Sequence, residues 1–165
     1  SKYALALAGK RAKRAGLAGK LLYATASVYA LPLADNTCDC VMSVFAPIAA
    51  DEAFRVLKPG GILLTAAAGR DHLTELKAVL YDTVIPTRRD YPENLALLHG
   101  ESLRYTADIA ESDIYPLFTM TPYFYRTKKE RAARLHALHT LHVTLDFELR
   151  VYKSVYIKRK SKCSV

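Results

Sequence analysis

The stretch from residue 52 to residue 65 constrains the fold most, because it encodes a helix, the end of that helix and a buried strand. Apolar residues recur at helical spacing up to Leu57, and Pro59 excludes the residue before it from the helical region, so the helix ends there. The two glycines that follow form a turn. Residues 62–68 are then an apolar run with one threonine, typical of a strand covered on both faces in a parallel sheet. The stretch predicts one helix-to-strand step of an α/β fold.

Length and composition indicate one folded domain. The 165 residues are 51% hydrophobic, which is enough for a real core. No apolar run is long enough for a membrane span and no segment resembles a signal peptide, so we expect a cytoplasmic protein. The three cysteines, Cys38, Cys40 and Cys163, suit neither a disulfide framework nor a zinc site, and no metal is expected. We expect a domain at residues 1–157 and a basic tail at 158–165.

The positive charge of the chain is clustered. The formal net charge is +8, from 24 Lys and Arg against 16 Asp and Glu. One basic group comprises Lys10, Arg11, Lys13, Arg14 and Lys20, and the other comprises Lys153, Lys158, Arg159, Lys160 and Lys162. Such groups suit the phosphates of a nucleic acid. A solvated helix face and a plain basic tail are the alternative interpretation.

Helices and strands are expected to alternate along the rest of the chain. Helices are expected at residues 1–8, with Ser1 as the N-cap, and at 49–57, 71–80, 111–118 and 128–139. Strands are expected at 21–26, 40–45, 62–68, 103–109 and 141–157, with turns or exposed connections at 32–37, 86–100 and 120–126. This alternation predicts a parallel, doubly wound sheet whose last element is a strand.

Ligands of open α/β sheets bind at the carboxyl ends of the strands, so the loops after the first three expected strands are the candidate site. Phe45 offers a ring on which a base can stack, and Pro47 fixes the direction of the chain after it. In the third loop Gly69 permits close backbone approach, and Asp71 is expected to cap a helix with His72 on its first turn. The alternatives are that Phe45 is ordinary core and that His72 is structural.

Two motifs in these regions resemble class I S-adenosylmethionine-dependent methyltransferases. Arg-Val-Leu-Lys-Pro-Gly-Gly-x-Leu at residues 55–63 resembles the segment that leads into the fifth strand of that family. Residues 26–33 resemble its Gly-Asp-Ala-x-x-Leu-Pro-Phe segment, where an acidic side chain and the next backbone N–H contact the adenine. Ser27 and Val28 take those places here, and a hydroxyl can still accept a hydrogen bond from an amino group. Ser27 as a plain turn residue is the alternative.

Three further motifs are more specific. They are Thr65-Ala66-x-x-Gly69-x-x-His72-Leu73-x-Glu75-Leu76-Lys77, Met120-Thr121-Pro122-Tyr123 and Thr144-x-Asp146-Phe147. Together they resemble the bacterial 23S ribosomal RNA guanine-N1 methyltransferases over essentially the whole chain. The resemblance implies an α/β fold with a Rossmann-like sheet flanked by helices and an antiparallel strand at the C-terminal end. It also implies S-adenosylmethionine as methyl donor, a guanine of ribosomal RNA as acceptor, and His72 at a cofactor-contacting position. The loop with Phe45 and Pro47 is expected, by the same resemblance, to lie beside the cofactor's methionine and the target base.

The resemblance also implies parts that this sequence does not contain. The family begins with a zinc module of cysteines and a histidine, followed by a strand and an Asp-x-Gly-Cys-Gly-type loop that holds the methionine end of the cofactor. This chain has seven glycines and no Gly-x-Gly. We therefore expect a fragment that is truncated on its N-terminal side, with unpaired sheet edges and weakened cofactor binding.

Aromatic and basic residues are the candidates for RNA contacts. Stacking on a base is expected from Phe45 or Tyr123. Phosphate contacts are expected from Arg126, Lys128, Lys129 and Arg131. The alternative for residues 123–125 is an aromatic cluster that closes the small end of the core. The group that handles the guanine N1 proton stays unassigned.

Two other function classes stay open. A small-molecule or lipid methyltransferase would share the central motifs without needing the basic groups, and its substrate binding would not weaken steeply with salt as RNA binding does. A non-catalytic RNA-binding remnant is the second alternative. The expected partners are ribosomal RNA and, as a further possibility, a second copy of the chain in a homodimer, with no membrane.

Overall fold

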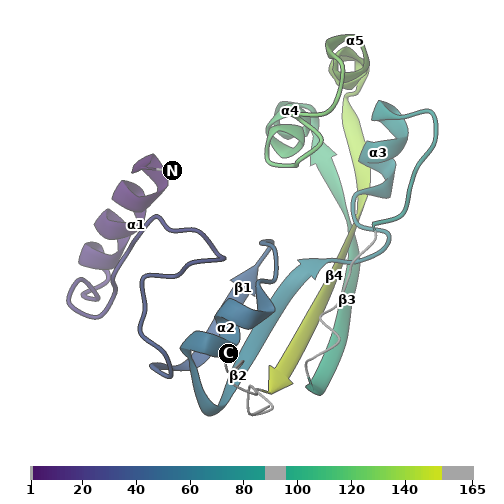
Figure 1. Ribbon diagram of the computed structural model, residues 1–165. Coiled ribbons are helices and arrows are strands. Elements are labelled where there is room, and N and C mark those ends of the chain that lie inside the picture. Colours follow the sequence, from purple (N-terminus) through teal and green to yellow (C-terminus); the bar gives the residue numbers. More distant parts are fainter. Residues whose placement is uncertain (1, 88–95, 154–165) are drawn as a thin grey trace, which may run out of the picture.

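The computed structural model describes residues 2–87 and 96–153. The helices are α1 (Lys2–Arg14), α2 (Ala50–Val56), α3 (Thr74–Leu80), α4 (Glu111–Thr119), α5 (Lys129–Ala132) and the 3-10 helix η1 (Ala133–Ala137). The strands are β1 (Cys38–Val44), β2 (Leu57–Ala68), β3 (Ala96–Ala110) and β4 (Thr140–Lys153). They form one curved sheet in the order β1-β2-β4-β3, with α2 near one end of it and the other sheet-packed helices near the opposite end (Figure 1).

The predicted helix-to-strand step is confirmed, with one difference in its boundary. Helix α2 passes directly into β2, and the strand begins at Leu57 rather than at Ile62. The reason is a bulge: Cys38 pairs with Leu57 but Cys40 pairs with Ile62, so the Pro-Gly-Gly turn lies between two rungs of one ladder. Gly60 supplies the positive φ of 82° that the turn requires.

The predicted α/β class and the antiparallel closing strand are confirmed, whereas the fully parallel sheet is not. Strands β1 and β2 are parallel, but β2 with β4 and β3 with β4 are antiparallel. Strand β3 ends at Ala110 and the chain returns through α4, α5 and η1 to start β4 at the same end of the sheet, which makes the β3–β4 pair antiparallel.

Further element boundaries differ from the predictions. Helix α1, expected at residues 1–8, runs to Arg14. Helix α3 begins at Thr74 instead of Asp71, and residues 96–100, expected in an exposed connection, are already part of β3. The basic helix expected at 128–139 is a short α-helix followed by a 3-10 turn. The expected cap Ser1, the connection at 88–94, the end of the last strand and the basic tail at 158–165 lie outside the described residues.

The strand expected at residues 21–26 is wrong. These residues have no regular structure, and their side chains are exposed, with Leu22 fully so. A strand needs a neighbour for its backbone N–H and C=O groups, and the described part of the chain offers this segment none. Only an isolated bridge between Ser27 and Ala30 follows it.

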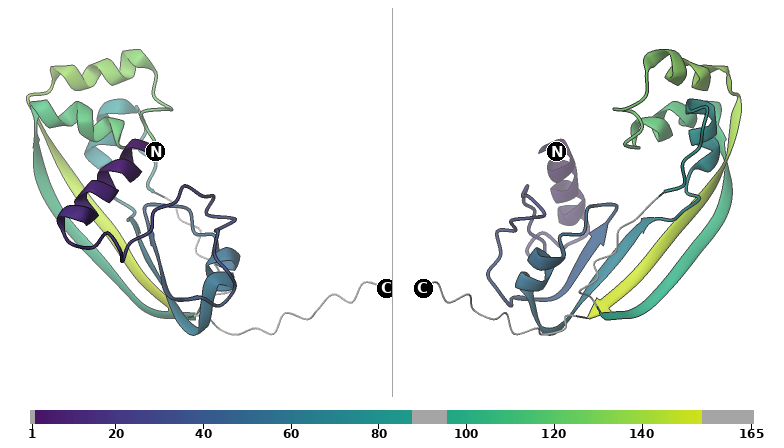
Figure 2. Two further views of the ribbon diagram at one scale, coloured as in Figure 1. Left: turned by 90° about the vertical axis from the view of Figure 1, so that its left-hand side faces the viewer. Right: turned by 45° about the vertical axis from the view of Figure 1, so that its right-hand side comes forward.

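The sheet carries two separate apolar clusters, and β4 runs from one to the other (Figure 2). The helical core forms where α3, α4 and η1 pack on the start of β4; its buried residues are Leu73, Leu76, Leu80, Ile114, Phe118, Leu135, Leu141 and Val143. The smaller α2 core comprises Ala53, Leu57, Leu63 and Tyr152. The candidate site lies between these two clusters along the sheet, at the carboxyl ends of β1 and β2.

Helix α1 stands apart from the sheet (Figures 1 and 2). Its last turn carries Arg11, Lys13 and Arg14, where positive charge complements the helix dipole. In the two described ranges, no helix combines the length and the apolar character that crossing a membrane requires.

Candidate functional site

Two of the three predicted loops meet at the ends of the parallel strand pair. Val44 of β1 pairs with Ala66 of β2, so Phe45 and the turn from Gly69 to Leu73 leave the sheet side by side. The backbone N–H of Phe45 donates to the carbonyl of Ala66 at 2.9 Å, which extends the ladder into the loop. The structure thus brings together Phe45 and His72, which were predicted from separate motifs.

The side chains at this edge form an aromatic cluster. The ring centroids of Phe45, His72 and Phe147 lie 5.0–6.0 Å from one another, and Tyr105 lies 6.0 Å from Phe147. These separations are typical of favourable edge and tilted contacts. Phe45 is nevertheless 56% exposed. Its ring is held by its neighbours and still has a free surface for a planar ligand.

Two residues of the site have strained backbones. Phe45 has φ 48° and Leu73 has φ 53°, in the left-handed region that residues with a Cβ seldom occupy. Each such residue costs about 1–3 kcal/mol and persists where its surroundings hold it in place. The N–H of Leu73 donates to the carbonyl of Thr144 at 2.8 Å and holds the second one. Positive φ values at the end of β1 and directly before α3 make this edge a candidate functional site.

The turn after β2 is built on Asp146, a buried residue of β4. Gly69 donates its N–H to the Asp146 carbonyl at 2.8 Å, and Asp71 donates its N–H to the Asp146 carboxylate at 2.9 Å. A Cβ at position 69 would collide with that carboxylate, so the predicted need for glycine is confirmed. The predicted cap is wrong, because Leu73 occupies the N-cap position and Asp71 lies earlier in the turn.

His72 belongs to the same turn and not to the first turn of the helix. Its Nδ1 accepts a hydrogen bond from the backbone N–H of Asp146 at 3.3 Å, so the proton of the neutral ring sits on Nε2. Burial lowers the pKa of His72 below its usual value. The lowered pKa favours the neutral imidazole, in which Nε2 carries the proton.

Glu75 fixes α3 against β4. Its two carboxylate oxygens accept from the N–H and the hydroxyl of Thr144 at 2.7 and 2.6 Å. Burial raises the pKa of Glu75, but the hydrogen bonds from Thr144 outweigh it and the pKa is lowered. The carboxylate therefore stays charged and keeps the helix, and the turn before it, in a fixed place on the sheet.

Ser27, Val28 and Pro47 belong to a second part of the site. A hollow of about 290 Å³ lies beside the end of β1; its lining includes Val28, Leu31, Val41, Ser43, Pro47 and Ala53. Ser27 precedes Val28, and its hydroxyl accepts from the N–H of Tyr29 at 3.2 Å. Ligand pockets start near 300 Å³, so this hollow is at the lower limit of size for a small-molecule site.

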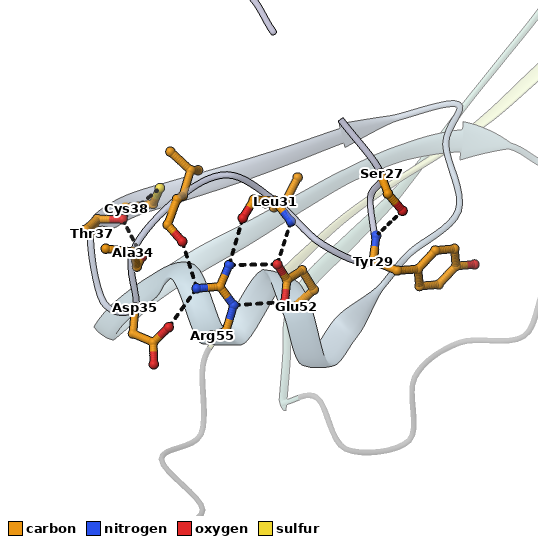
Figure 3. A network of polar contacts seen from close by, with 10 residues as sticks. Ser27, Tyr29, Leu31, Ala34, Asp35, Thr37, Cys38, Glu52 and Arg55 are labelled. Carbon is orange, nitrogen blue, oxygen red and sulfur yellow. Dashed lines mark hydrogen bonds and ion pairs between the residues drawn. The ribbon is translucent and has the colours of Figure 1, made fainter. Parts of the chain in front are cut away.

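The loop beside this hollow is tied to α2 by polar contacts (Figure 3). Arg55 bridges Glu52 and Asp35, with 2.7 and 2.6 Å between the charged atoms. The Glu52 carboxylate accepts the N–H of Leu31 at 2.6 Å. The hydrogen bond from Arg55, followed by that from Leu31, holds the pKa of Glu52 at about 2. The hydrogen bond with Glu52, followed by that with Asp35, raises the pKa of Arg55.

The residues predicted to contact RNA lie elsewhere, beside the helical core. Tyr123 is half-buried and packs edge-on against Tyr81 at 6.2 Å, and burial raises its pKa. The buried ammonium of Lys77 lies 5.9 Å from the Tyr123 ring and donates to the Thr87 hydroxyl; burial lowers the pKa of Lys77. This packing agrees with the alternative interpretation, in which Tyr123 belongs to a group of aromatic residues that closes the core. Contact of Tyr123 with RNA stays a prediction.

The basic residues near Tyr123 differ in their surroundings. Arg131 is paired with Asp82 at 2.7 Å, whereas Arg126, Lys128 and Lys129 are exposed. Arg131 must therefore break or share its ion pair with Asp82 before it can bind a phosphate. In the described part of the chain, no ring pair, hydrogen bond or ion pair joins any of these basic residues to the rings of Phe45, His72 and Phe147.

Known proteins share both the sequence and the fold. A family model described as a methyltransferase domain matches residues 1–65. YxjB of Bacillus subtilis, provisionally named a 23S rRNA (guanine-N(1)-)-methyltransferase, is 30% identical over 139 residues, which is 79% of this chain and 49% of YxjB. In sequence the chain is thus similar to methyltransferases. It spans about half the length of the curated relatives it matches.

Two further proteins are similar to this chain. The ubiquinone/menaquinone biosynthesis C-methyltransferase UbiE of Cellvibrio japonicus is 32% identical over 100 residues, covering 56% of this chain and 40% of UbiE. The solved structure of the YcgJ protein from Bacillus subtilis has a TM-score of 0.56 and 14% identity, covering 93% of this chain and 79% of that one. The likeness to YcgJ confirms the Rossmann-like fold.

Sequence reasoning missed part of the site. Phe147 and Asp146 stood in a family motif but were not predicted as site residues, because only the antiparallel return of β4 places them beside Phe45 and His72. The Glu52–Arg55 pair was also missed. Its signal was present, since acidic and basic residues three positions apart face each other on a helix.

Proposed function

We propose that this chain contributes to the transfer of a methyl group from S-adenosylmethionine to N1 of a guanine in 23S ribosomal RNA. The observation that carries the proposal is the aromatic cluster at the paired ends of β1 and β2, with Phe45 exposed beside a neutral His72. A flat, partly open aromatic surface is what a protein needs to hold an unstacked RNA base. The similarity to YxjB supports guanine N1 as the acceptor.

The residues of the chain have distinct tasks in this proposal. When bound, S-adenosylmethionine would supply an electrophilic methyl group. Guanine N1 would bond to the methyl carbon as the carbon–sulfur bond breaks, so that S-adenosylhomocysteine leaves and the N1 proton is lost to a base or to water. Val28 and Pro47 border the hollow that receives the adenine, and Ser27 offers a hydroxyl to its amino group. Phe45 holds the guanine by stacking, and the Nε2–H of His72 donates toward the ligands at the strand ends. Orientation of the two reactants is the main contribution to rate.

The test is methylation of a 23S rRNA transcript by the chain in the presence of S-adenosylmethionine. Methylation at N1 blocks Watson–Crick pairing, so reverse transcription stops at the modified guanine. We expect a stop with the unchanged chain and its loss with Phe45→Ala. Tyr3→Ala is the control, because Tyr3 is an exposed aromatic residue on α1, away from the aromatic cluster. A stop of equal strength in Phe45→Ala would contradict the role of the ring.

A small-molecule methyltransferase is the second candidate function, and the similarity to UbiE favours it. The two candidates differ in their response to salt. Binding of an RNA hairpin would weaken steeply between about 50 and 200 mM salt, because each neutralised phosphate releases counterions. Transfer to a neutral small substrate would hardly change over that range. A methylation rate that is insensitive to salt, with no methylated RNA, would therefore select the second candidate.

A further inference from the structure

Every N–H group of the Arg55 guanidinium donates a hydrogen bond within the protein. Its Nε and Nη2 donate to the two carboxylate oxygens of Glu52 at 2.9 and 2.7 Å. Its remaining hydrogen bonds go to the Asp35 carboxylate at 2.6 Å and to the carbonyls of Leu33 and Leu31 at 2.8 and 3.1 Å. A guanidinium has five N–H donors in a fixed planar arrangement. All five are therefore committed to one short loop and one helix residue.

These contacts hold a segment that has little other support. Residues 21–30 lie outside the sheet, and all of them except Val28 are exposed. Leu31 follows directly, and it is held at both backbone groups: its N–H donates to Glu52 and its carbonyl accepts from Arg55. The next residues are also tied to α2, because the N–H of Asn36 donates to the Arg55 carbonyl at 2.9 Å.

Leu31 ends the turn that carries the predicted adenine contacts. The N–H of Ala30 donates to the carbonyl of Ser27 at 3.1 Å and closes that turn. Val28, at its tip, lines the hollow together with Leu31 and Ala53 of α2. A shift of Leu31 would therefore move Val28 across the opening of the hollow. Figure 3 shows the turn and the polar contacts next to each other on α2.

We propose that Arg55, acting through Glu52, is a positioning residue that sets the turn from Ser27 to Leu31 for recognition of the adenine ring. The inference rests on the proposed function, since it requires S-adenosylmethionine in the hollow. Arg55 does not touch the cofactor in this proposal. It acts by fixing Leu31, and thereby the direction of the Ser27 hydroxyl and the Val28 backbone.

The experiment compares the unchanged chain with Arg55→Gln, Arg55→Lys and Lys58→Gln. Lys58→Gln is the matched control, because it breaks an exposed ion pair of similar length, 2.7 Å to Asp39, that does not reach the loop. Three quantities are measured on each variant: hydrogen exchange of the Leu31 amide, the melting temperature, and the affinities for S-adenosylhomocysteine and S-inosylhomocysteine. The last pair differs only at the position of the adenine amino group.

We expect Arg55→Gln to speed exchange at Leu31 and to weaken S-adenosylhomocysteine binding by about tenfold each, the size that loss of one or two charge-assisted hydrogen bonds produces. The preference for the adenine over the hypoxanthine form should shrink, because the Ser27 hydroxyl no longer has a fixed direction. In both quantities Arg55→Lys should fall between the unchanged chain and Arg55→Gln, since an ammonium cannot reproduce the planar set of five donors. Lys58→Gln should match the unchanged chain.

Two results would overturn the inference. Unchanged exchange at Leu31 in both Arg55 variants would show that other contacts hold the turn. An equal loss of affinity for both ligands, in step with a lower melting temperature, would show a merely structural role. If the unchanged chain binds neither ligand, the proposed function fails and with it the role toward adenine. In that case, faster exchange of the Leu31 amide in Arg55→Gln would still show that Arg55 holds the turn, so that the missing ligand binding could not be attributed to the Arg55 contacts.

Discussion

The helical core and the strand-end site are held together by different forces. The helical core consists of apolar side chains from α3, α4, η1 and β4 that are almost completely buried. The strand-end site comprises Phe45, the turn from Gly69 to Leu73, Asp146 and Phe147. It has one exposed ring, that of Phe45, two residues with a positive φ and a buried carboxylate. Apart from Leu73, which belongs to both, the helical core and the proposed recognition site are thus separate parts of this sheet. Substitutions should therefore separate them.

Phe118→Ala should have the largest effect on stability. Phe118 is 1% exposed in the helical core, and its ring also contacts the more exposed rings of Tyr115 and Phe124. Removing a buried phenylalanine ring leaves a cavity and costs about 3–5 kcal/mol. Urea unfolding measures the loss. Met120→Ala, two residues on and 84% exposed, is the control and should cost little. A small loss in Phe118→Ala would mean that the helical core does not carry the stability.

Gly69→Ala should have the next largest effect, at the strand-end site. The new Cβ would collide with the Asp146 carboxylate, which also accepts the N–H of Asp71. Overpacking of this kind costs about 1–3 kcal/mol. Gly9→Ala is the matched control, because a Cβ there meets open space on α1. Thermal unfolding of both variants gives the comparison, and equal melting temperatures would contradict the tight fit of the turn on Asp146.

Local patterns predicted most of the fold because they depend on neighbouring residues. The end of α2 before the Pro-Gly-Gly turn, the run of β2 and helix α4 each follow from a short window. Helix α4 begins at Glu111, where it was expected, because an alternating strand pattern gives way there to helical spacing. Strand 21–26 failed for the opposite reason, since an apolar window cannot show whether a partner strand lies beside it.

The site was predictable in part. The strand-end rule placed Phe45 and His72 near each other, because both follow parallel strands. It could not place Phe147, which reaches the same edge from an antiparallel strand about 75 residues later along the chain. The rule also could not predict the left-handed backbone of Phe45, because no residue type in the sequence indicates that a phenylalanine has a positive φ.

Phe45→Gly should separate strain from recognition at the strand-end site. Glycine accepts the φ of 48° without a steric penalty, so relief of strain offsets the loss of ring contacts. We expect a change in the free energy of unfolding within about 1 kcal/mol, together with loss of base stacking and of RNA methylation. Phe45→Leu keeps the strain, loses the ring and should be the less stable of the two. If Phe45→Gly methylates normally, the ring is not part of the site.

The smallest expected effect is a pH dependence of stability from His72. Burial keeps its pKa in the folded chain below the ordinary value of 6.5, so between these two values the unfolded chain binds more protons. The contribution of neutral His72 to stability is therefore complete above pH 6.5 and is lost as the pH falls toward the folded pKa. His72→Gln should flatten this part of the curve, whereas His99→Gln, at an exposed position of β3, should leave it in place. The measurement is the free energy of unfolding in urea of the unchanged chain and both variants at pH 7.5 and at about pH 5.5.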